Sequence, residues 1–520
     1  MPAAETITTL RRRSLRPVLA LTLFACLVPL CVTPVLPLTD FYAHIARYYI
    51  LAKLPDSVML QQNYEAAWQL LPNLGLDILG TGIMHVLPPL LGAKLIAGLI
   101  IAAPFAGILY LSRVLHGQLS VLTVFLAGLV AYNHILIWGF SNFLLGLGVL
   151  LGAIGYWIAT QDRPVRQLTV TMCIGVLLFF IHGLAFALWG LLLGAVELSL
   201  ALGPGHPGGR TLFYKASRLA LVAVIPTLLF TQTKTIGAGS TIPIESILAH
   251  AEQGTLWVRL STEAYLRVDG FLRVAETTWQ SIDWGFGIVL WGVLIGGLVT
   301  GILQIDRRMK LAVALCVLLI LIVPPTLFGV GHLGERIPLL LLALLAASLS
   351  LAPDVKSPSR EIVVVMIAGL FLARNLMLSI GWYQDSRSYV SYLEALNSHD
   401  TRSLGAGAYV EDARNPRFFR PNCRPLSFLM IFNGTAIPTF ADPTQHPLHI
   451  IGPLAQVQNV VQSVASDAHH TVPSAIATLS NAKADTIVVC STESFPPKIQ
   501  GFNILATTAP WILYQRSASK

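Results

Sequence analysis

The chain has 520 residues, of which 54% are hydrophobic and only 12% are charged, and its mean hydropathy is +0.68. A soluble chain usually carries about 25% charged residues, so this composition excludes an ordinary soluble protein and predicts a polytopic membrane protein. The net charge of +8 is explained by loop topology and contact with anionic lipid, and we expect no nucleic-acid partner.

The N-terminal segment combines a basic cluster with a long apolar run. Arg11, Arg12, Arg13 and Arg16 precede an apolar stretch that ends near Pro37. This stretch is longer than the apolar core of a signal peptide, and no clear small-x-small cleavage site follows it. We therefore interpret it as a retained first membrane helix.

Eleven apolar segments predict membrane-spanning α-helices. A single helix over 167–202 would be about 54 Å long, whereas a hydrocarbon core is about 30 Å thick, so we place a break at His182. His182 itself is interpreted as a hydrogen-bonding residue of the bundle. The predicted segments are 17–37, 94–112, 118–133, 138–160, 167–182, 184–202, 217–233, 284–304, 310–327, 337–353 and 361–380.

Basic residues between these segments predict the topology. If the N-terminus lies in the cytoplasm, every inner loop carries at least one cation, as the positive-inside rule requires. An odd number of helices then places the C-terminus on the outer side. We expect the protein to reside in a bacterial inner membrane. The cations assigned to the inner loops are Arg113, Arg163, Arg166, Arg210, Lys215, Arg218, Arg307, Arg308, Lys310, Lys356 and Arg360.

The predicted fold is an α-helical polytopic membrane domain over 1–380 followed by a small α/β extracytoplasmic domain over 381–520. Two large outer loops, 38–93 and 234–283, belong to the membrane domain. The first of them begins with an amphipathic run that predicts a helix lying along the membrane surface. Cys423 and Cys490 fall in the outer domain, a compartment that permits a disulfide without requiring one.

Asp40, His44 and Arg47 lie within one short run just outside the first predicted helix. On a helix, residues four apart share a face, so Asp40 and His44 become near neighbours. A carboxylate there can deprotonate an acceptor group and act as a catalytic residue. The alternative is that Asp40 only caps the helix, although Thr39 could serve equally well.

Two further polar interruptions precede apolar stretches. Asn73 and Asp77 could line the same outer cavity, or they could mark a turn and a helix start, which we favour. Asn142 begins an apolar segment rich in glycine. Helix packing is its default interpretation, and a place in a polar cavity is the alternative.

The outer turn between the ninth and tenth segments contains Gly331, His332, Glu335 and Arg336. A guanidinium beside glycine residues suits recognition of a phosphate. Glu335 could neutralise or orient Arg336. The alternative is a charge that only anchors the helix at the membrane interface.

Taken together, this layout resembles the C-type (GT-C) glycosyltransferases, which are integral-membrane enzymes that use polyprenyl-phosphate-linked sugars. In detail, three motifs resemble uncharacterised bacterial multi-pass proteins related to that superfamily. They are Asp40-x-x-x-His44-x-Ala-Arg47, Leu71-Pro-Asn73-Leu-x-Leu-Asp77 and Gly139-Phe-Ser-Asn142-Phe-Leu-Leu-Gly146. The resemblance covers about 1–380 and rests on layout more than on one motif.

The resemblance implies a glycosyltransferase that moves a hexosyl or pentosyl group to a glycan, lipid or protein acceptor. Asp40 would assist the acceptor, and Arg336 or Arg259 would bind the lipid phosphate. Many such enzymes carry two adjacent acidic residues in this loop. Here Phe41 follows Asp40, so His44 would supply the second polar group.

The alternative function is a non-catalytic protein that binds or transports a lipid-linked precursor. Coupled transport predicts charged residues at mid-membrane depth, whereas this chain concentrates its charges at the ends of the apolar runs. No cysteine or histidine spacing indicates a metal site. We therefore expect no cofactor, and a requirement for a divalent metal stays open.

Overall fold

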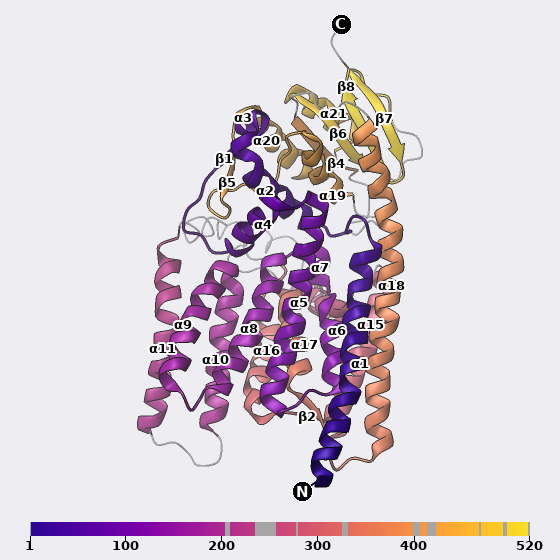
Figure 1. Cartoon of the computed structure of the whole chain (residues 1–520). Helices are drawn as coiled ribbons and strands as arrows, with labels where there is room; N and C mark the ends of the chain where they lie inside the picture. The colour runs from indigo at the N-terminus through magenta and orange to yellow at the C-terminus, as the bar shows by residue number, and fades with distance from the viewer. Residues whose placement is uncertain are drawn as a thin grey trace.

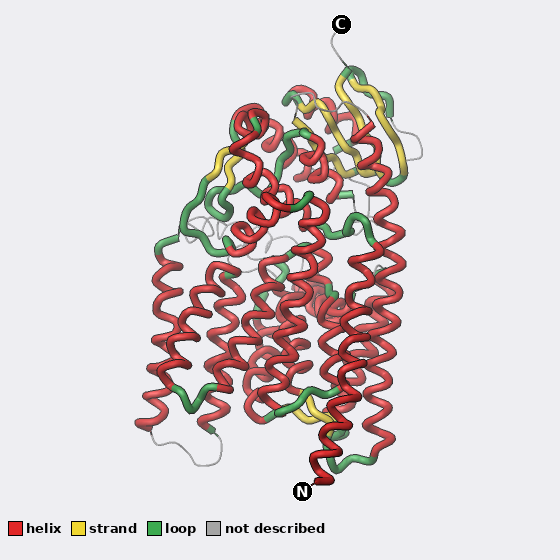
Figure 2. Tube along the Cα trace, in the orientation of Figure 1, coloured by secondary structure: helices red, strands yellow, loops and turns green. Residues whose placement is uncertain are grey.

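The structure, a computed structural model, describes residues 2–202, 209–233, 256–276, 279–324, 331–398, 406–412, 423–466, 470–491 and 497–517. A bundle of long helices forms one part of the molecule, and the C-terminal part covers one end of it (Figure 1). Helices account for nearly all of the bundle, and the strands are gathered mainly in the C-terminal part (Figure 2).

Each of the eleven predicted apolar segments forms a helix in the described part of the chain. The helices of the bundle are α1 (Pro2–Val32), α5 (Pro89–His116), α6 (Val121–Ala131), α8 (Ser141–Ala159), α9 (Pro164–Ile181), α10 (Gly183–Ala201), α11 (Gly209–Thr231), α15 (Gln280–Val299), α16 (Lys310–Ile322), α17 (Leu333–Ser348) and α18 (Ser357–Ser398). The predicted fold class is confirmed.

Nine helical segments among the described residues are long and apolar enough to cross a membrane, with α6 counted together with the short helix α7 (His134–Trp138). The two that fall short are α16, with 13 residues, and α17, with 16. Pro324 and Pro325 follow α16 closely, and proline cannot continue a helix.

The first outer loop contains α2 (Phe41–Lys53), α3 (Val58–Asn63) and α4 (Gly75–Val86). The predicted helix after Asp40 is therefore present as α2. Ten of its residues are buried, so most of its surface contacts other parts of the chain. The C-terminal part covers it, and Thr439 Oγ1 donates a hydrogen bond of 2.9 Å to the Ala43 carbonyl. The second outer loop contributes α14 (Leu256–Leu272) and the single turn η2 (Arg273–Ala275).

The C-terminal part is built on a four-stranded sheet in the order β4-β6-β8-β7. Strand β4 pairs parallel with β6, and the other pairs are antiparallel. A disulfide joins Cys423 to Cys490, at the start of one helix and the end of a strand. The elements are β4 (Ala406–Glu411), β6 (Ala484–Cys490), β7 (Phe502–Thr508), β8 (Trp511–Arg516), α19 (Arg424–Leu429), α20 (Gly452–Ser466) and α21 (Val472–Asn481).

The membrane part and the C-terminal part are connected in two ways. Helix α18 continues without interruption across the predicted boundary at 380 and carries the chain into the C-terminal part (Figure 1). In addition, β1 (Tyr64–Ala66) from the first outer loop pairs antiparallel with β5 (Leu448–Ile450). The first outer loop therefore packs against the C-terminal part.

The opposite end of the bundle holds the N-terminus and a small ladder of β2 (Leu303–Ile305) and β3 (Leu349–Leu351) (Figure 1). Arg307 and Arg308 follow β2 after one intervening residue, Asp306. The predicted inner and outer segments thus lie at opposite ends of the molecule. Which end faces the cytoplasm stays a prediction.

Candidate functional site at the covered end of the bundle

Asp40 immediately precedes α2, and the turn after α7 holds its backbone. The Asp40 N–H donates a hydrogen bond of 3.0 Å to the Trp138 carbonyl, and the Thr39 N–H donates one of 2.8 Å to the Ile137 carbonyl. Gly139 adopts φ +90°, and a Cβ on it would lie only 2.4 Å from the Phe41 nitrogen. This close approach requires glycine because any side chain would strike the backbone of α2.

The Asp40 side chain does not cap α2, since it makes no capping hydrogen bond. Instead, its Oδ1 lies 3.0 Å from Nε of Arg424, which comes from α19 in the C-terminal part. The two groups form an ion pair without a well-aligned hydrogen bond. Burial raises the pKa of Asp40, and the neighbouring Arg424 guanidinium and His332 imidazole oppose this rise. The carboxylate is 13% exposed and therefore remains within reach of a ligand.

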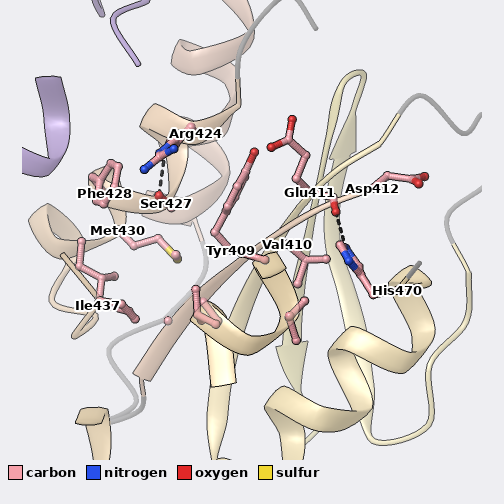
Figure 3. A pocket seen from close by; sticks show the side chains of 16 residues that line it. Tyr409, Val410, Glu411, Asp412, Arg424, Ser427, Phe428, Met430, Ile437 and His470 are labelled. Atoms are coloured by element: carbon pink, nitrogen blue, oxygen red, sulfur yellow. Dashed lines mark hydrogen bonds between the residues drawn. The ribbon is translucent and has the colours of Figure 1, made fainter. Parts of the chain in front are cut away.

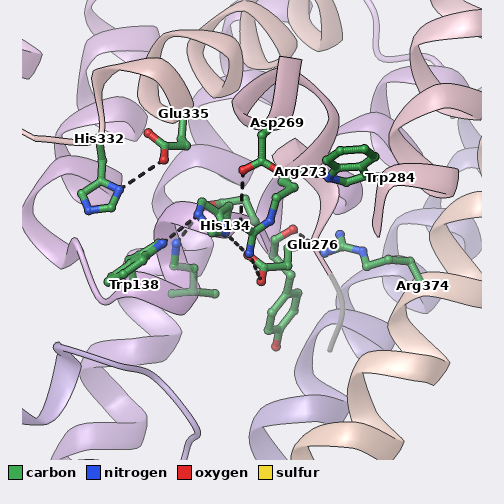
Figure 4. A network of polar contacts seen from close by, with 12 residues as sticks. His134, Trp138, Asp269, Arg273, Glu276, Trp284, His332, Glu335 and Arg374 are labelled. Atoms are coloured by element: carbon green, nitrogen blue, oxygen red, sulfur yellow. Dashed lines mark hydrogen bonds and ion pairs between the residues drawn. The ribbon is translucent and has the colours of Figure 1, made fainter. Parts of the chain in front are cut away.

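His332 and Arg336 lie on the other side of the same turn. The His332 ring packs against Trp138 at 4.5 Å and against Phe140 at 5.1 Å between ring centroids. Its Nδ1 lies 3.3 Å from a Glu335 carboxylate oxygen, as Figure 4 shows. Glu335 thus contacts the imidazole and forms no ion pair with Arg336.

The Arg336 guanidinium is stacked on aromatic rings. Its central carbon lies 4.2 Å from the Phe140 centroid and 5.4 Å from the Phe143 centroid. The residue is 4% exposed. Among the described residues no ion pair is formed to this guanidinium, and its Nε has no hydrogen-bond partner. A buried cation in this state is costly unless an anion joins it.

Asn73 and Asn142 are joined by a hydrogen bond near the start of α8. The side-chain amide of Asn142 donates a hydrogen bond of 3.1 Å to the backbone carbonyl of Asn73. The side-chain oxygens of both residues have no hydrogen-bond partner in the described part of the chain. Asn142 precedes Phe143, which stacks on Arg336.

Arg47 and Asp77 form a different arrangement. Arg47 Nε lies 2.6 Å from Asp77 Oδ1, with the side chains 0% and 1% exposed. Arg47 also donates to the Phe440 carbonyl and contacts His44 Nδ1 at 3.0 Å. Burial, followed by the charge of Arg47, lowers the pKa of His44. This cluster joins α2, α4 and the C-terminal part, and the His44 ring contacts Arg47 and Phe440.

A buried polar network joins the second outer loop to α7 (Figure 4). His134 Nδ1 contacts Glu276, while its Nε2 accepts a hydrogen bond of 2.7 Å from the indole N–H of Trp138. Arg273 pairs with Glu276 at 3.0 Å and with Asp269 at 3.4 Å. This network fixes the orientation of Trp138, whose ring packs on His332.

The structure thus places Asp40, Glu335 and Arg336 near the turn at Gly139 and Phe140. It joins Asn142 to Asn73 and places His44, Arg47 and Asp77 in a separate cluster. The predicted Arg259 lies in α14, but its side chain lies outside the described residues. Among the described residues, no group of three His, Cys, Asp or Glu side chains is placed to hold a metal ion.

Sequence reasoning missed Arg424, Trp138 and Glu276. Arg424 lies almost 400 positions beyond Asp40, and no pattern in its own segment points to that carboxylate. Trp138 falls at the start of the predicted segment 138–160, where nothing in the apolar pattern distinguishes it. Glu276 is one of several acidic residues in the outer loop 234–283, and no local pattern distinguishes it from the others.

No family model matches the chain, and no curated protein matches its sequence. Among solved structures, the chain is similar to ArnT from Cupriavidus metallidurans. The crystal structure of ArnT bound to undecaprenyl phosphate is 12% identical, with a TM-score of 0.49, over 97% of this chain and 98% of that chain. The apo structure is 11% identical, with a TM-score of 0.48, over 98% of both chains. At this identity the similarity concerns the arrangement of helices and assigns no residue roles.

Proposed function

We propose that the protein is a membrane glycosyltransferase that moves a hexosyl or pentosyl group from a polyprenyl-phosphate donor to an acceptor hydroxyl. One observation carries the proposal. A buried guanidinium without an ion-pair partner among the described residues, Arg336, and a partly accessible carboxylate, Asp40, lie on either side of the turn at Gly139 and Phe140.

Arg336 is the proposed phosphate ligand. Its planar guanidinium is fixed by Phe140 and Phe143, and a phosphate oxygen would supply the missing acceptor for its N–H groups. The ligand's negative charge would also remove the cost of burying an unpaired cation. The unpaired amide oxygens of Asn73 and Asn142 can accept hydrogen bonds from sugar hydroxyls.

Asp40 is the proposed general base. The acceptor hydroxyl oxygen attacks the anomeric carbon of the donor sugar, and the bond from this carbon to the phosphate oxygen breaks. The hydroxyl proton passes to Asp40, and the polyprenyl phosphate leaves with the bonding electron pair. Arg336 stabilises the negative charge that develops on the departing phosphate.

We further propose that this end of the bundle faces outward from a bacterial inner membrane. Two observations support this orientation. A disulfide links Cys423 and Cys490 next to the site, and disulfides persist in oxidising compartments. The basic pair Arg307 and Arg308 lies at the opposite end, as the positive-inside rule requires of a cytoplasmic face.

The phosphate assignment is tested by binding of a fluorescent polyprenyl phosphate to the purified protein in nanodiscs. We expect Arg336→Gln to weaken binding roughly tenfold or more, because one charge-assisted contact is lost. Arg218→Gln is the matched control, since Arg218 is also buried and stacks on an aromatic ring, Trp157, at 5.1 Å. Equal effects of both changes would contradict the assignment.

The transfer step is tested by the lipid-linked sugar and envelope glycan profiles of cells that produce Asp40→Asn or Asp40→Ala. Both changes should abolish the product while donor binding persists. A normal profile in both variants would show that Asp40 is not catalytic. Vesicles that move a labelled polyprenyl sugar across the bilayer and form no transfer product would instead favour transport.

A further inference from the structure

A second potential binding site lies inside the C-terminal part of the chain. It is a cavity of about 550 Å³ between β4, α19 and α20 (Figure 3). Small-molecule sites in proteins typically measure about 300 to 1,000 Å³. The cavity therefore has room for a ligand of one to three sugar rings.

The lining combines apolar walls with a few polar groups. Phe428, Met430 and Val464 contribute apolar surface, while Glu411 and His470 contribute polar atoms. This combination is typical of sites for small molecules, in which apolar walls provide contact and a few polar groups set orientation. Sugar rings match such a lining because their C–H faces are apolar and their edges carry hydroxyls.

Tyr409 and Glu411 form a polar pair in this lining. The Tyr409 hydroxyl is buried and interacts with the Glu411 carboxylate, although the two groups make no well-aligned hydrogen bond. A carboxylate has about four lone-pair sites, so this pair can also accept hydrogen bonds from a ligand. Tyr409 and Glu411 lie two residues apart on β4, so they share one face of the strand, and Figure 3 shows both side chains pointing in the same direction.

Arg424 connects this cavity to the proposed catalytic carboxylate. It lines the cavity, and its Nε lies 3.0 Å from Asp40. The backbone of Arg424 is held in place by the neighbouring disulfide at Cys423. Only one side chain therefore separates a ligand in the cavity from the proposed general base.

We infer that this cavity binds the acceptor of the transfer reaction and that the acceptor is a neutral glycan. The inference rests on the proposed function, because it assigns a substrate class to that reaction. Tyr409 and Glu411 would hydrogen-bond sugar hydroxyls, and the reacting hydroxyl would extend past Arg424 to Asp40.

Charge selects a neutral glycan over a phosphorylated one. The described lining contains two carboxylates, Glu411 and Asp412, and one guanidinium, Arg424, which is already paired with Asp40. A phosphate in the cavity would be repelled by Glu411 and would compete with Asp40 for the same cation.

The test measures glycan binding to the full-length protein in nanodiscs, without any donor. Binding is detected by saturation-transfer NMR. The probes are neutral hexose mono- to trisaccharides and the same sugars carrying a phosphate monoester. We expect the neutral sugars to bind roughly tenfold or more tightly than the phosphorylated ones. Absence of binding by every neutral probe, or tighter binding of the phosphorylated series, would overturn the inference.

Variants locate the bound sugar. Tyr409→Phe removes only the hydroxyl that interacts with Glu411, so the fold should survive while glycan affinity falls several-fold. Tyr383→Phe, on exposed α18 surface, is its control. Val464→Trp should fill the cavity and abolish binding, whereas Gln462→Trp, exposed on the same helix and not part of the lining, should leave it unchanged.

The experiments separate this inference from the proposed function. Glycan binding could depend on Tyr409 and Val464 without any transfer reaction. This result would refute the proposed glycosyltransferase activity and would leave the proposed binding site standing. Transfer to a neutral glycan with an unchanged KM in Tyr409→Phe and Val464→Trp would refute the cavity and leave the reaction intact.

Discussion

Two buried arginines have opposite environments, and this difference decides their roles. Arg47 is fully buried and pairs with Asp77 at 2.6 Å. Arg336 is almost equally buried, yet it stacks on Phe140 and Phe143 and has no ion pair among the described residues. A buried guanidinium with an ion-pair partner needs no external anion, whereas one without a partner favours the binding of an anionic ligand.

Removing one partner of the Arg47 pair should destabilise the protein. We expect Asp77→Asn to lower the free energy of unfolding by about 3 kcal/mol, because Arg47 would remain buried without its carboxylate. Thermal unfolding of the detergent-solubilised protein measures the effect. The double change Arg47→Met with Asp77→Leu should recover much of the loss, and equal stability of Asp77→Asn and the wild type would contradict the structural role.

Asp40 should show a pH dependence that Arg424 controls. As a general base it acts only when ionised, and burial raises its pKa, so the transfer rate should fall with acidification at a pH above the usual aspartate range. Arg424 lowers this pKa. Arg424→Gln should therefore shift the acidic limb of the rate profile to higher pH, whereas Arg387→Gln, an exposed change on α18, should not. A downward shift would contradict the assignment.

At the scale of elements, the site depends on how α2 meets the turn between α7 and α8. The Asp40 N–H bonds to the Trp138 carbonyl, and Gly139 lies directly against Phe41. The buried network at Glu276 and His134 then orients the Trp138 ring. Backbone contacts at this junction and the side-chain network around Glu276 together fix the positions of the site residues.

Gly139→Ala should disrupt this junction. Its positive φ disfavours alanine, and the new Cβ would lie 2.4 Å from the Phe41 nitrogen, so we expect a loss of about 1–3 kcal/mol in stability and a larger relative loss of transfer rate. Gly190→Ala in α10 has open space around its Cβ and serves as the control. Thermal unfolding and initial rates measured together would show whether only Gly139 is sensitive.

The disulfide should hold Arg424 in position. Replacing Cys423 and Cys490 with serine opens a cross-link between residues 67 positions apart, which typically costs about 2–4 kcal/mol. We expect lower thermal stability together with weaker glycan binding. Cys31→Ser, at an exposed free cysteine, is the control for the loss of a thiol. If a reductant leaves the thermal stability of the wild type unchanged, the prediction is contradicted.

At the scale of the whole molecule, the site lies between two bodies of different composition. The helical bundle supplies Arg336, and the C-terminal part supplies Arg424 and covers α2. A lipid-linked donor can approach from the bundle, while a polar acceptor can approach from the cavity. This division matches a reaction between a membrane-bound and a water-soluble substrate.

The orientation of the molecule is tested by labelling with a membrane-impermeant maleimide in intact cells whose outer membrane has been permeabilised. In a background with Cys31 and Cys173 replaced by serine, Ser398→Cys should react. Gln118→Cys, exposed at the opposite end, should react only after the inner membrane is opened. Reaction of Gln118→Cys in intact cells would invert the proposed topology.

The sequence by itself determined the membrane class, the eleven helical segments and the presence of Asp40 and Arg336 near helix ends, because hydropathy and charge act locally along the chain. It did not determine that α2 is buried, that Arg47 pairs with Asp77 or that Arg424 reaches Asp40. These contacts join residues about 30 to 400 positions apart, so their energies depend on tertiary packing that no local pattern encodes. Only the tertiary structure showed which buried charges are paired, and the proposed ligand site rests on that difference.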